Sequence, residues 1–245
     1  MRLKLISCEV LLREMCAVVA RSPHQIDVEF LPKGLHDLAG ARMRDRIQER
    51  IDAIGSAHYD AIILGYGLCG NGALGICARN IPVIMPRVHD CIALLMGSRH
   101  RYQQYFDAHA GVYFRSPGWL ERGEDLDQSK LERNRFRTGA GLALEELIAR
   151  YGEDGGRYVY EQLTAYRRTY QQITYIQTGV EGNDRFEQRA REEATTRGWQ
   201  FESLPGSLSI FERLVNGDWC VEDFLIVPPG AAVERRYDAD IIGTA

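Results

Sequence analysis

The fold of this chain is decided by Tyr59-Asp60-Ala61-Ile62-Ile63-Leu64-Gly65-Tyr66-Gly67-Leu68-Cys69-Gly70-Asn71-Gly72. The first half of this stretch is a short, continuous apolar run, which is typical of a strand buried on both faces of a parallel sheet. The run passes directly into a loop in which four of eight residues are glycine. In an open parallel sheet such strand-to-helix loops carry the ligand sites. The stretch therefore predicts a buried parallel strand followed by a candidate functional loop.

Other apolar runs of strand length lie on both sides of this stretch, separated by amphipathic segments. The expected strands are Leu3–Ser7, Ile26–Leu31, Ile81–Met85, Gly111–Phe114, Ile173–Gln177, Trp199–Leu204 and Phe224–Val227. This alternation predicts an α/β fold with a mostly parallel sheet and helices on both of its faces. Two Rossmann-like halves are one way to arrange these strands. We also expect a short helix from the end of the glycine-rich loop to about Arg79.

The domain boundary is expected in residues 120–140. This segment is rich in charge and glycine and has no apolar periodicity, which predicts a long surface connection or a lid. On this interpretation residues 1–119 form an N-terminal α/β half and residues 141–245 a C-terminal one. The alternative is a single domain across residues 1–245.

The composition is that of a globular protein, with 245 residues, of which 45% are hydrophobic and 26% charged. A net charge of −4 argues against nucleic acid or an anionic membrane as the partner. No apolar run approaches the roughly 18 residues of a membrane-spanning helix. Only seven residues precede Cys8, too few for a lipoprotein signal, so we expect a cytoplasmic protein. Its partner would be a small molecule or another protein, and a homo-oligomer is compatible with the sequence.

Soft or borderline metal ligands follow four successive expected strands of the N-terminal half. Parallel strands end at one edge of the sheet, so these side chains are expected to meet there. Thiolates and imidazoles suit zinc, iron or an iron–sulfur cluster. The predicted metal ligands are Cys8, His36, Cys69, His89 and Cys91.

Two carboxylates lie beside these candidates in the sequence. Glu9 and Asp90 are expected either to take part in the chemistry or to orient a metal ligand. The purely structural alternative is that the cysteines are buried apolar thiols and the histidines are hydrogen-bonded surface groups. Cys16 and Cys77 lie within expected helices on apolar faces, and we interpret them as core residues.

The glycine-rich loop allows a second interpretation. It follows a strand and fits the dinucleotide fingerprint, with an acidic residue about 20 positions further on. A nucleotide or another phosphate ligand would then be bound by Gly65, Gly67, Gly70, Asn71 and Gly72.

A third interpretation needs no metal. Cys69 or Cys91 would act as a nucleophile, with His36 or His89 as its base. Beyond these residues, Pro117-Gly118-Trp119 is a candidate aromatic wall for a ligand, or a tryptophan that pins two parts of the chain together.

The chain resembles a bacterial and archaeal family named domain of unknown function 1638, DUF1638. The resemblance rests on Cys8-Glu9, Gly34-Leu35-His36, the octapeptide Gly65–Gly72 and His89-Asp90-Cys91. It extends through the Trp119 loop to Pro228-Pro229-Gly230, and so covers most of the chain. It implies a role linked to one-carbon and corrinoid-dependent methyl metabolism, but it assigns no active residue.

We therefore expect a metal-binding α/β protein, either an enzyme or an accessory protein of methyl metabolism. Zinc with an open position would activate a thiol for methyl transfer, whereas an iron–sulfur cluster would imply electron transfer or reductive activation. The partner would be a small-molecule substrate or a corrinoid methyl-carrier protein. A non-enzymatic metal carrier and a nucleotide-binding protein remain the alternatives.

Overall fold

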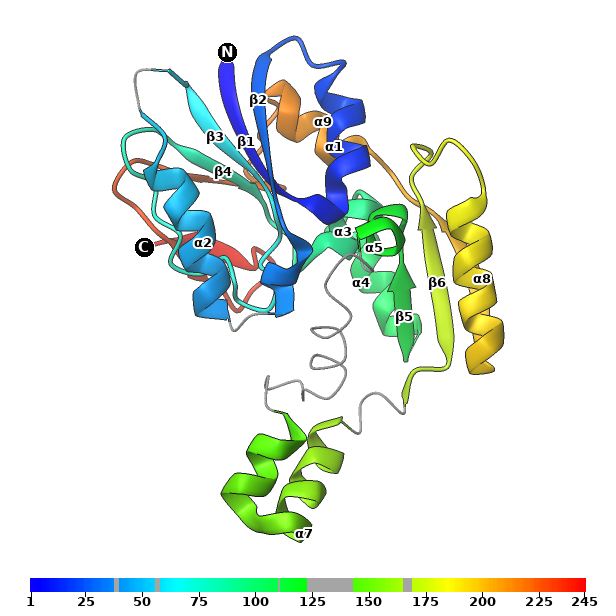
Figure 1. Ribbon diagram of the computed structural model, residues 1–245. Coiled ribbons are helices and arrows are strands. Elements are labelled where there is room, and N and C mark those ends of the chain that lie inside the picture. Colours follow the sequence, from blue (N-terminus) through cyan, green and yellow to red (C-terminus); the bar gives the residue numbers. More distant parts are fainter. Residues whose placement is uncertain (38–39, 56–57, 110, 123–142, 165–168) are drawn as a thin grey trace.

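The computed structural model describes residues 1–37, 40–55, 58–109, 111–122, 143–164 and 169–245, and it confirms the α/β fold (Figure 1). The larger sheet has the strand order β2-β1-β3-β4-β8, the second sheet the order β5-β6-β7, and β9 and β10 form a small pair. The strands are β1 (Arg2–Cys8), β2 (Gln25–Leu31), β3 (Ala61–Gly65), β4 (Val83–Pro86), β5 (Val112–Arg115), β6 (Gln172–Gln177), β7 (Gln200–Pro205), β8 (Phe224–Val227), β9 (Val233–Arg235) and β10 (Ile242–Thr244).

Helices connect most of the parallel strands. They are η1 (Glu9–Leu11), α1 (Leu12–Val19), η2 (Lys33–Asp37), α2 (Gly40–Asp52), α3 (Cys91–Met96), α4 (Arg99–Ala108), α5 (Pro117–Arg122), α7 (Leu144–Thr164), α8 (Arg185–Arg197) and α9 (Ser209–Asn216). The helix α7 is interrupted by a non-helical conformation at Gly152. None of the helices in the described part of the chain is long and apolar enough to cross a membrane.

The larger sheet is parallel except at one edge. β1 pairs in parallel with β2 and β3, and β3 pairs in parallel with β4. β8 runs antiparallel to β4, so the mostly parallel sheet that the sequence predicted is confirmed with this one exception. Because β1 to β4 point the same way, the residues that leave these four strands share one edge of the sheet.

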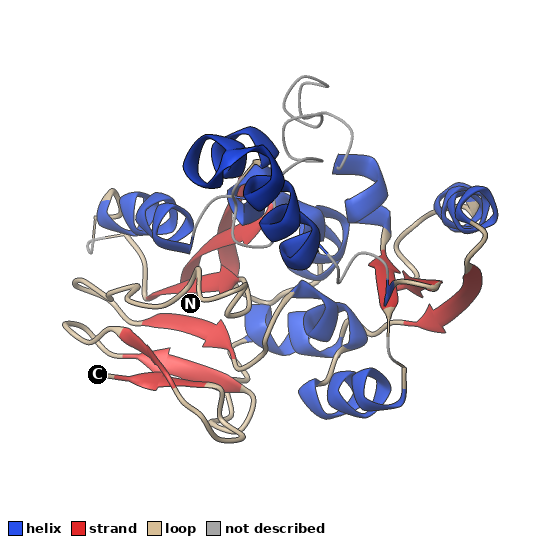
Figure 2. Cartoon of the chain, turned by 90° about the horizontal axis from the view of Figure 1, so that it is seen from below, coloured by secondary structure: helices blue, strands red, loops and turns tan. Residues whose placement is uncertain are grey.

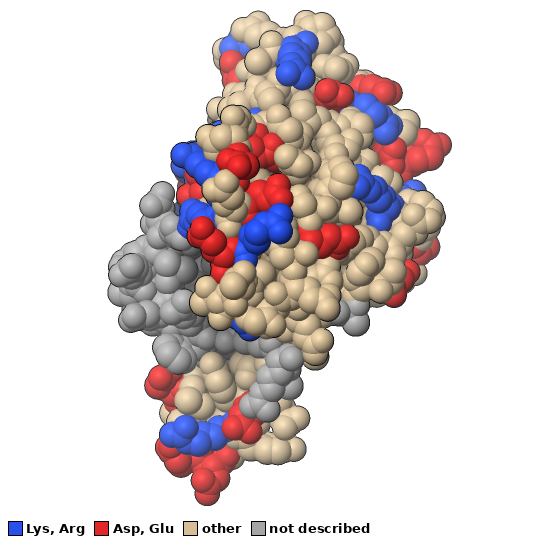
Figure 3. Space-filling view, turned by 90° about the vertical axis from the view of Figure 1, so that its right-hand side faces the viewer, with Lys and Arg blue, Asp and Glu red and all other residues tan. Residues whose placement is uncertain are grey.

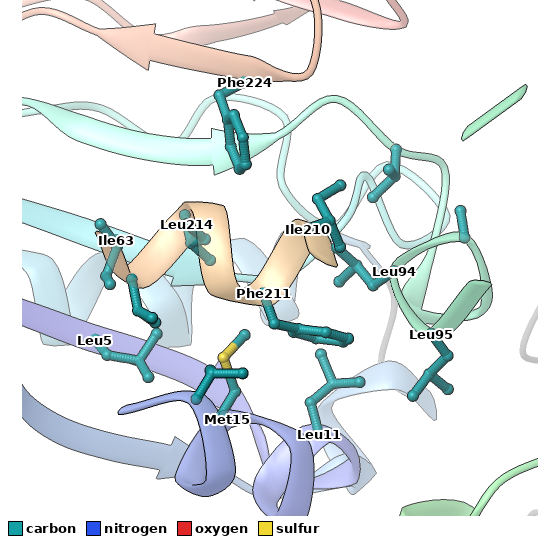
Figure 4. Packing of buried hydrophobic residues seen from close by; sticks show 14 of the residues in the cluster. Leu5, Leu11, Met15, Ile63, Leu94, Leu95, Ile210, Phe211, Leu214 and Phe224 are labelled. Carbon is teal, nitrogen blue, oxygen red and sulfur yellow. The ribbon is translucent and has the colours of Figure 1, made fainter. Parts of the chain in front are cut away.

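Both faces of the larger sheet are buried. On one face Leu5 and Ile63 pack against α1 and α9, including Phe211 of α9 (Figure 4). On the other face Leu64 packs beneath α2, whose inner side includes Ile47. Successive strand residues face opposite ways, so a strand covered on both sides must be apolar throughout. This requirement explains the unbroken apolar run of β3.

The second sheet is parallel and is packed on one face by α8. Ile173 and Tyr175 of β6 contact a cluster that includes Phe186 and Ala190 of α8. Ile176, the next residue of β6, belongs to the core of the larger sheet instead. Figure 2, a view from below, shows helices lying between the two sheets. The hydrophobic core is thus continuous from one sheet to the other.

The chain passes from the larger sheet to the second sheet and back again. β5 precedes the predicted boundary but belongs to the second sheet, whereas β8 follows it and completes the larger sheet. The predicted connection over residues 120–140 lies outside the described residues from position 123 onward. The division into residues 1–119 and 141–245, and the single-domain alternative, both stay predictions.

Two local predictions were wrong. No helix follows the glycine-rich loop, because Cys69, Gly70 and Asn71 have φ angles of 47°, 62° and 73°, in the left-handed region that a right-handed helix excludes. The chain continues in turns instead, and Cys77 forms an isolated β-bridge with Ala232. Cys16 is exposed rather than part of the core.

The surface of α8 carries charges of both signs. Its ion pairs include Arg191 with Glu187 and Arg197 with Glu193. On the face that Figure 3 shows, Lys and Arg side chains are interspersed with Asp and Glu. The described residues on this face therefore form no extended basic patch. That nucleic acid is not a partner of this protein stays a prediction.

One carboxylate is buried where α1 meets the loop after β6. Glu14 is fully buried, and its Oε1 accepts a hydrogen bond from Thr178 Oγ1 at 2.8 Å. The same loop buries Glu181, whose Oε1 accepts the Thr178 N–H at 2.7 Å. Burial, and to a smaller degree the charge of Glu181, raises the pKa of the Glu14 carboxyl.

Replacing Glu14 by Gln should remove a pH dependence of stability. Because its pKa is raised, the folded state binds the Glu14 proton more tightly than the unfolded state does. Stability is thus greatest below the ordinary carboxyl pKa and falls as the pH rises through the raised value. Glu14→Gln keeps the acceptor oxygen but removes the ionisable group. The free energy of unfolding of this variant, relative to that of wild type, should therefore increase as the pH rises.

Urea unfolding between about pH 4.5 and pH 8 measures this difference. Glu192→Gln is the control, because Glu192 is an exposed carboxylate on α8. A difference between Glu14→Gln and wild type that stays constant over this pH range would contradict the assignment.

Candidate functional site

Three of the predicted metal ligands meet at the carboxyl edge of the larger sheet. Cys8 is the last residue of β1, Cys69 lies in the loop after β3, and Cys91 is the first residue of α3 after β4. All three line one largely enclosed pocket with about 20 Å³ of free space, roughly the room of one water molecule. They also lie close enough that charge on Cys8 and Cys69 raises the pKa of Cys91. The structure therefore brings these three thiols together, as the strand-end placement predicted.

The second sheet contributes to the same pocket through Trp119. This residue belongs to α5, directly after β5, and the Lys33 ammonium lies 4.5 Å from the centre of its ring. Gly118 allows α5 to approach η1, since a Cβ atom there would lie 1.7 Å from the Val10 carbonyl oxygen. Trp119 thus forms an aromatic wall. The complete lining is Cys8, Val10, Pro32, Lys33, Leu35, Met43, Gly65, Tyr66, Cys69, Cys91 and Trp119.

The pocket thiols are held in their protonated form. Burial raises the pKa of Cys8 to about 11 and that of Cys69 to about 12, and it also raises the pKa of Cys91. The nearby Trp119 side chain partly offsets the effect on Cys91. Catalytic cysteines have lowered pKa values, because the thiolate is the nucleophile. The electrostatics of the pocket therefore oppose the interpretation of Cys69 or Cys91 as an activated nucleophile.

Tyr66 places an unsatisfied hydroxyl in the pocket. Its side chain is only 3% exposed, and its hydroxyl has no hydrogen-bond partner among the described residues. Burial, with smaller contributions from the charges of Cys8, Cys69 and Glu9, raises its pKa, so the hydroxyl remains a proton donor. Burying an unpaired donor costs about 1–3 kcal/mol.

Of the two predicted histidine ligands, only His89 has a described side chain. His89 is exposed, and it contributes its backbone carbonyl, which accepts the Cys69 N–H at 2.8 Å. His36 lies in η2, but its side chain lies outside the described part of the structure. The metal-ligand roles of both histidines stay predictions.

The two predicted carboxylates hold the edge of the pocket in place. Asp90 caps α3: its Oδ1 accepts the Ile92 and Ala93 N–H groups at 3.0 and 3.1 Å. Its Oδ2 accepts the Tyr102 hydroxyl at 3.1 Å. Glu9 accepts the Lys33 N–H at 2.7 Å and so ties the exit of β1 to the exit of β2. These contacts are structural, and a chemical role for either carboxylate stays a prediction.

The glycine-rich loop packs against the loop that leaves β4. The N–H groups of Leu68 and Cys69 donate to the Val88 and His89 carbonyls at 2.9 and 2.8 Å. This approach requires Gly67, because a Cβ atom there would lie 2.8 Å from the Asp90 nitrogen. The loop thereby brings Cys69 next to Cys91.

Nothing in this geometry tests phosphate binding by Gly65, Gly67, Gly70, Asn71 and Gly72, which stays a prediction. The dinucleotide fingerprint expects a helix to begin at this loop, and turns follow it here instead. The Asn71 side chain accepts a hydrogen bond from Arg235 at 3.2 Å.

The three thiols share one pocket but do not form a ready-made metal site. Among the residues that the structure describes, no three His, Cys, Asp or Glu side chains are placed to hold a single metal ion. With zinc–sulfur bonds of about 2.3 Å, a tetrahedral zinc ion needs sulfur atoms about 3.8 Å apart. Binding of a metal by all three thiols would therefore require them to rearrange.

Sequence reasoning did not single out Tyr66, Lys33 or Met43 as pocket residues. Tyr66 directly follows β3, and Lys33 begins the connection after β2. Both would have been identified if every residue type at the end of a parallel strand had been considered, and not metal ligands alone. Met43 approaches from the inner face of α2 and carried no comparable signal.

Alkylation should label the pocket thiols slowly at neutral pH. Raising a thiol pKa from 9.0 to about 11 for Cys8 and about 12 for Cys69 lowers the thiolate fraction at pH 7 about a hundredfold and a thousandfold. Cys16 is exposed and should react with iodoacetamide first. Peptide mapping by mass spectrometry measures the rates, with urea-unfolded protein as the control. Fastest labelling of Cys69 or Cys91 would instead support an activated nucleophile.

Comparison with known proteins returns one family. The sequence model of a family described as "Protein of unknown function (DUF1638)" matches residues 30–215. The match runs from the end of β2 to α9 and includes Tyr66, Cys69, Cys91 and Trp119. No curated protein and no solved structure matches the chain. The resemblance indicated by the sequence motifs is thereby confirmed.

Proposed function

Since the chain belongs to the DUF1638 family, described as proteins of unknown function, we propose a function from the pocket itself, namely binding of a metal by Cys8, Cys69 and Cys91, as a zinc ion or as an iron–sulfur cluster. The observation that carries the proposal is three thiols around one largely enclosed pocket. Cysteine thiolates are the usual ligands of such clusters.

A cluster would use the three thiols differently from a single ion, and it would require the lining to move apart, because the free space in the pocket is about 20 Å³. Each cysteine binds a different iron atom, so the three sulfur atoms lie around the cluster and need not share one coordination sphere. Three cysteines would leave one iron of a four-iron cluster without a protein thiolate. That iron would be the position open to a substrate or to an exogenous ligand.

The protonated state of the thiols is compatible with this role. Metal binding displaces thiol protons, because the thiolate is the ligand. Burial of Cys8, Cys69 and Cys91 makes the free thiolates unfavourable. A bound cation would supply positive charge next to the thiolates. The protein contributes the charge of Lys33, which lowers the pKa of Cys8.

The class of activity follows from the cluster and from the family resemblance. An iron–sulfur cluster accepts and donates single electrons, so the protein would serve electron transfer or reductive activation. The link to methyl metabolism that the resemblance implies makes a corrinoid methyl-carrier protein the proposed partner, with a small-molecule substrate as the alternative. Zinc bound by the same thiols would instead indicate methyl transfer to a thiol, or a metal carrier.

Protein purified without oxygen should contain bound metal, and a cluster would give about four irons and four sulfides per chain with broad visible absorption. Cys69→Ser and Cys91→Ser should lose most of the metal, because serine does not replace a thiolate ligand. Cys16→Ser should keep it, since Cys16 is exposed on α1 and lies outside the pocket. Elemental analysis and absorption spectra measure both results, and circular dichroism confirms that the variants fold.

Other results assign the pocket differently. One zinc per chain without visible absorption, lost in Cys69→Ser and Cys91→Ser, would replace the cluster by a single-ion site. Protein that takes up neither iron with sulfide nor zinc on reconstitution would refute metal binding altogether.

A further inference from the structure

The loop that leaves β6, residues 178–184, contains two glycines that give its backbone freedom to turn. Gly179 and Gly182 have φ angles of 84° and 73°, in the left-handed region that glycine adopts without strain. A Cβ atom at either position would meet nothing within 4 Å, so close packing does not require these glycines. They serve the path of the chain instead, and they permit the segment between them to reorient.

This loop contacts α1 through Thr178. The Thr178 Oγ1 donates to Glu14 Oε1 at 2.8 Å, and the Thr178 N–H donates to Glu181 Oε1 at 2.7 Å. Glu14 is fully buried, and Glu181 is 7% exposed. One threonine thus joins a buried carboxyl on the first α-helix of the chain to a second carboxyl in its own loop.

The Glu14 carboxyl is only half satisfied in this contact. Its Oε2 is buried and accepts no hydrogen bond from any other residue that the structure describes. An ionised carboxylate in such a place lacks the donors that would replace its lost hydration, whereas a neutral acid loses much less on burial. The closed contact therefore favours the protonated carboxyl, and burial raises its pKa accordingly.

Arg13, the cation that α1 places beside Glu14, is engaged elsewhere. Its Nε and Nη2 donate to the Glu121 carboxylate of α5 at 2.8 and 2.7 Å. Burial raises the pKa of Glu14 most, the like charge of Glu181 raises it further, and Arg13 opposes these effects least of all. The ion pair with Glu121 explains why Arg13 does so little for Glu14.

The other elements around this contact contribute neutral, acidic or apolar groups. β6 contributes the Tyr175 hydroxyl, whose pKa is raised by burial and then by the charge of Glu181, so that it stays neutral. α8 contributes the acidic Glu187, whose charge also reaches Tyr175. α9 packs against α1 through apolar side chains such as Phe211. An ionised Glu14 would thus face groups that do not stabilise its charge.

We propose that the Glu14–Thr178 contact is a pH-dependent device that holds residues 178–184 against α1 while Glu14 is protonated. When the loop moves away, the hydrogen bond from Thr178 breaks and Glu14 meets water. The Glu14 O–H bond then ionises, and its proton passes to the solvent. Opening uncovers the carboxyl end of β6, and this is the edge at which parallel sheets bind their ligands.

The neighbouring contacts between α1 and α5 stay closed when this contact opens. Gly118 of α5 lies so near to η1 that a Cβ atom would be 1.7 Å from the Val10 carbonyl oxygen. The Arg13–Glu121 ion pair is a second link between α1 and α5. Neither link involves the Glu14 carboxyl. The opening is therefore local, which distinguishes it from unfolding of the whole chain.

Hydrogen–deuterium exchange of the full chain between about pH 5 and pH 8 tests this inference. In wild type the protection factor of residues 178–184 should fall with rising pH by up to about tenfold per pH unit, because each opening releases one proton. Glu14→Gln cannot ionise, so its loop should stay protected over the whole range. Thr178→Val lacks the hydroxyl and should leave the loop poorly protected at every pH.

Glu192→Gln is the matched control, because it changes an exposed carboxylate on α8, and it should follow wild type. Peptides from the buried strand β3 should keep their protection in every variant. Loop protection that does not change with pH in wild type would overturn the inference. A fall that Glu14→Gln shares, or that β3 shows to the same extent, would overturn it as well.

Discussion

The parallel pairing of β1, β3 and β4 is the constraint on which the site depends. In the observed register Ser7 of β1 lies opposite Gly65 of β3, so both strands end at the same level. The chain leaving each strand then has only a short distance in which to place Cys8, Cys69 and Cys91 around one pocket. A shift in this register would move the thiols apart, even if the immediate surroundings of each thiol stayed the same.

A second constraint is the backbone contact between the loops that leave β3 and β4. Their hydrogen bonds use the amides of Leu68 and Cys69. Gly67 allows this close approach between the two loops. The pocket they enclose holds the unpaired Tyr66 hydroxyl, whose burial costs stability. This cost is expected of a site built for an occupant and not for stability.

Much of this architecture could be predicted from the sequence. The buried strand at Ala61–Gly65, the mostly parallel sheet and the convergence of Cys8, Cys69 and Cys91 follow from local patterns and from the direction of parallel strands. The rest depends on tertiary contacts. Left-handed backbone at Asn71 ended the expected helix, and the exposure of Cys16 depends on how α1 is rotated against the sheet. The pairing of β5 with β6, which brings Trp119 to the pocket, has no local signature.

The antiparallel strand β8 also has a consequence for how the protein is made. It closes the edge of β4 only after the whole second sheet has been synthesised. During translation the nascent larger sheet therefore exposes an apolar edge strand, which in other proteins invites pairing with neighbouring chains. Contacts this distant in sequence also slow folding. The strand order itself thus leaves β4 with an unpaired edge until late in synthesis.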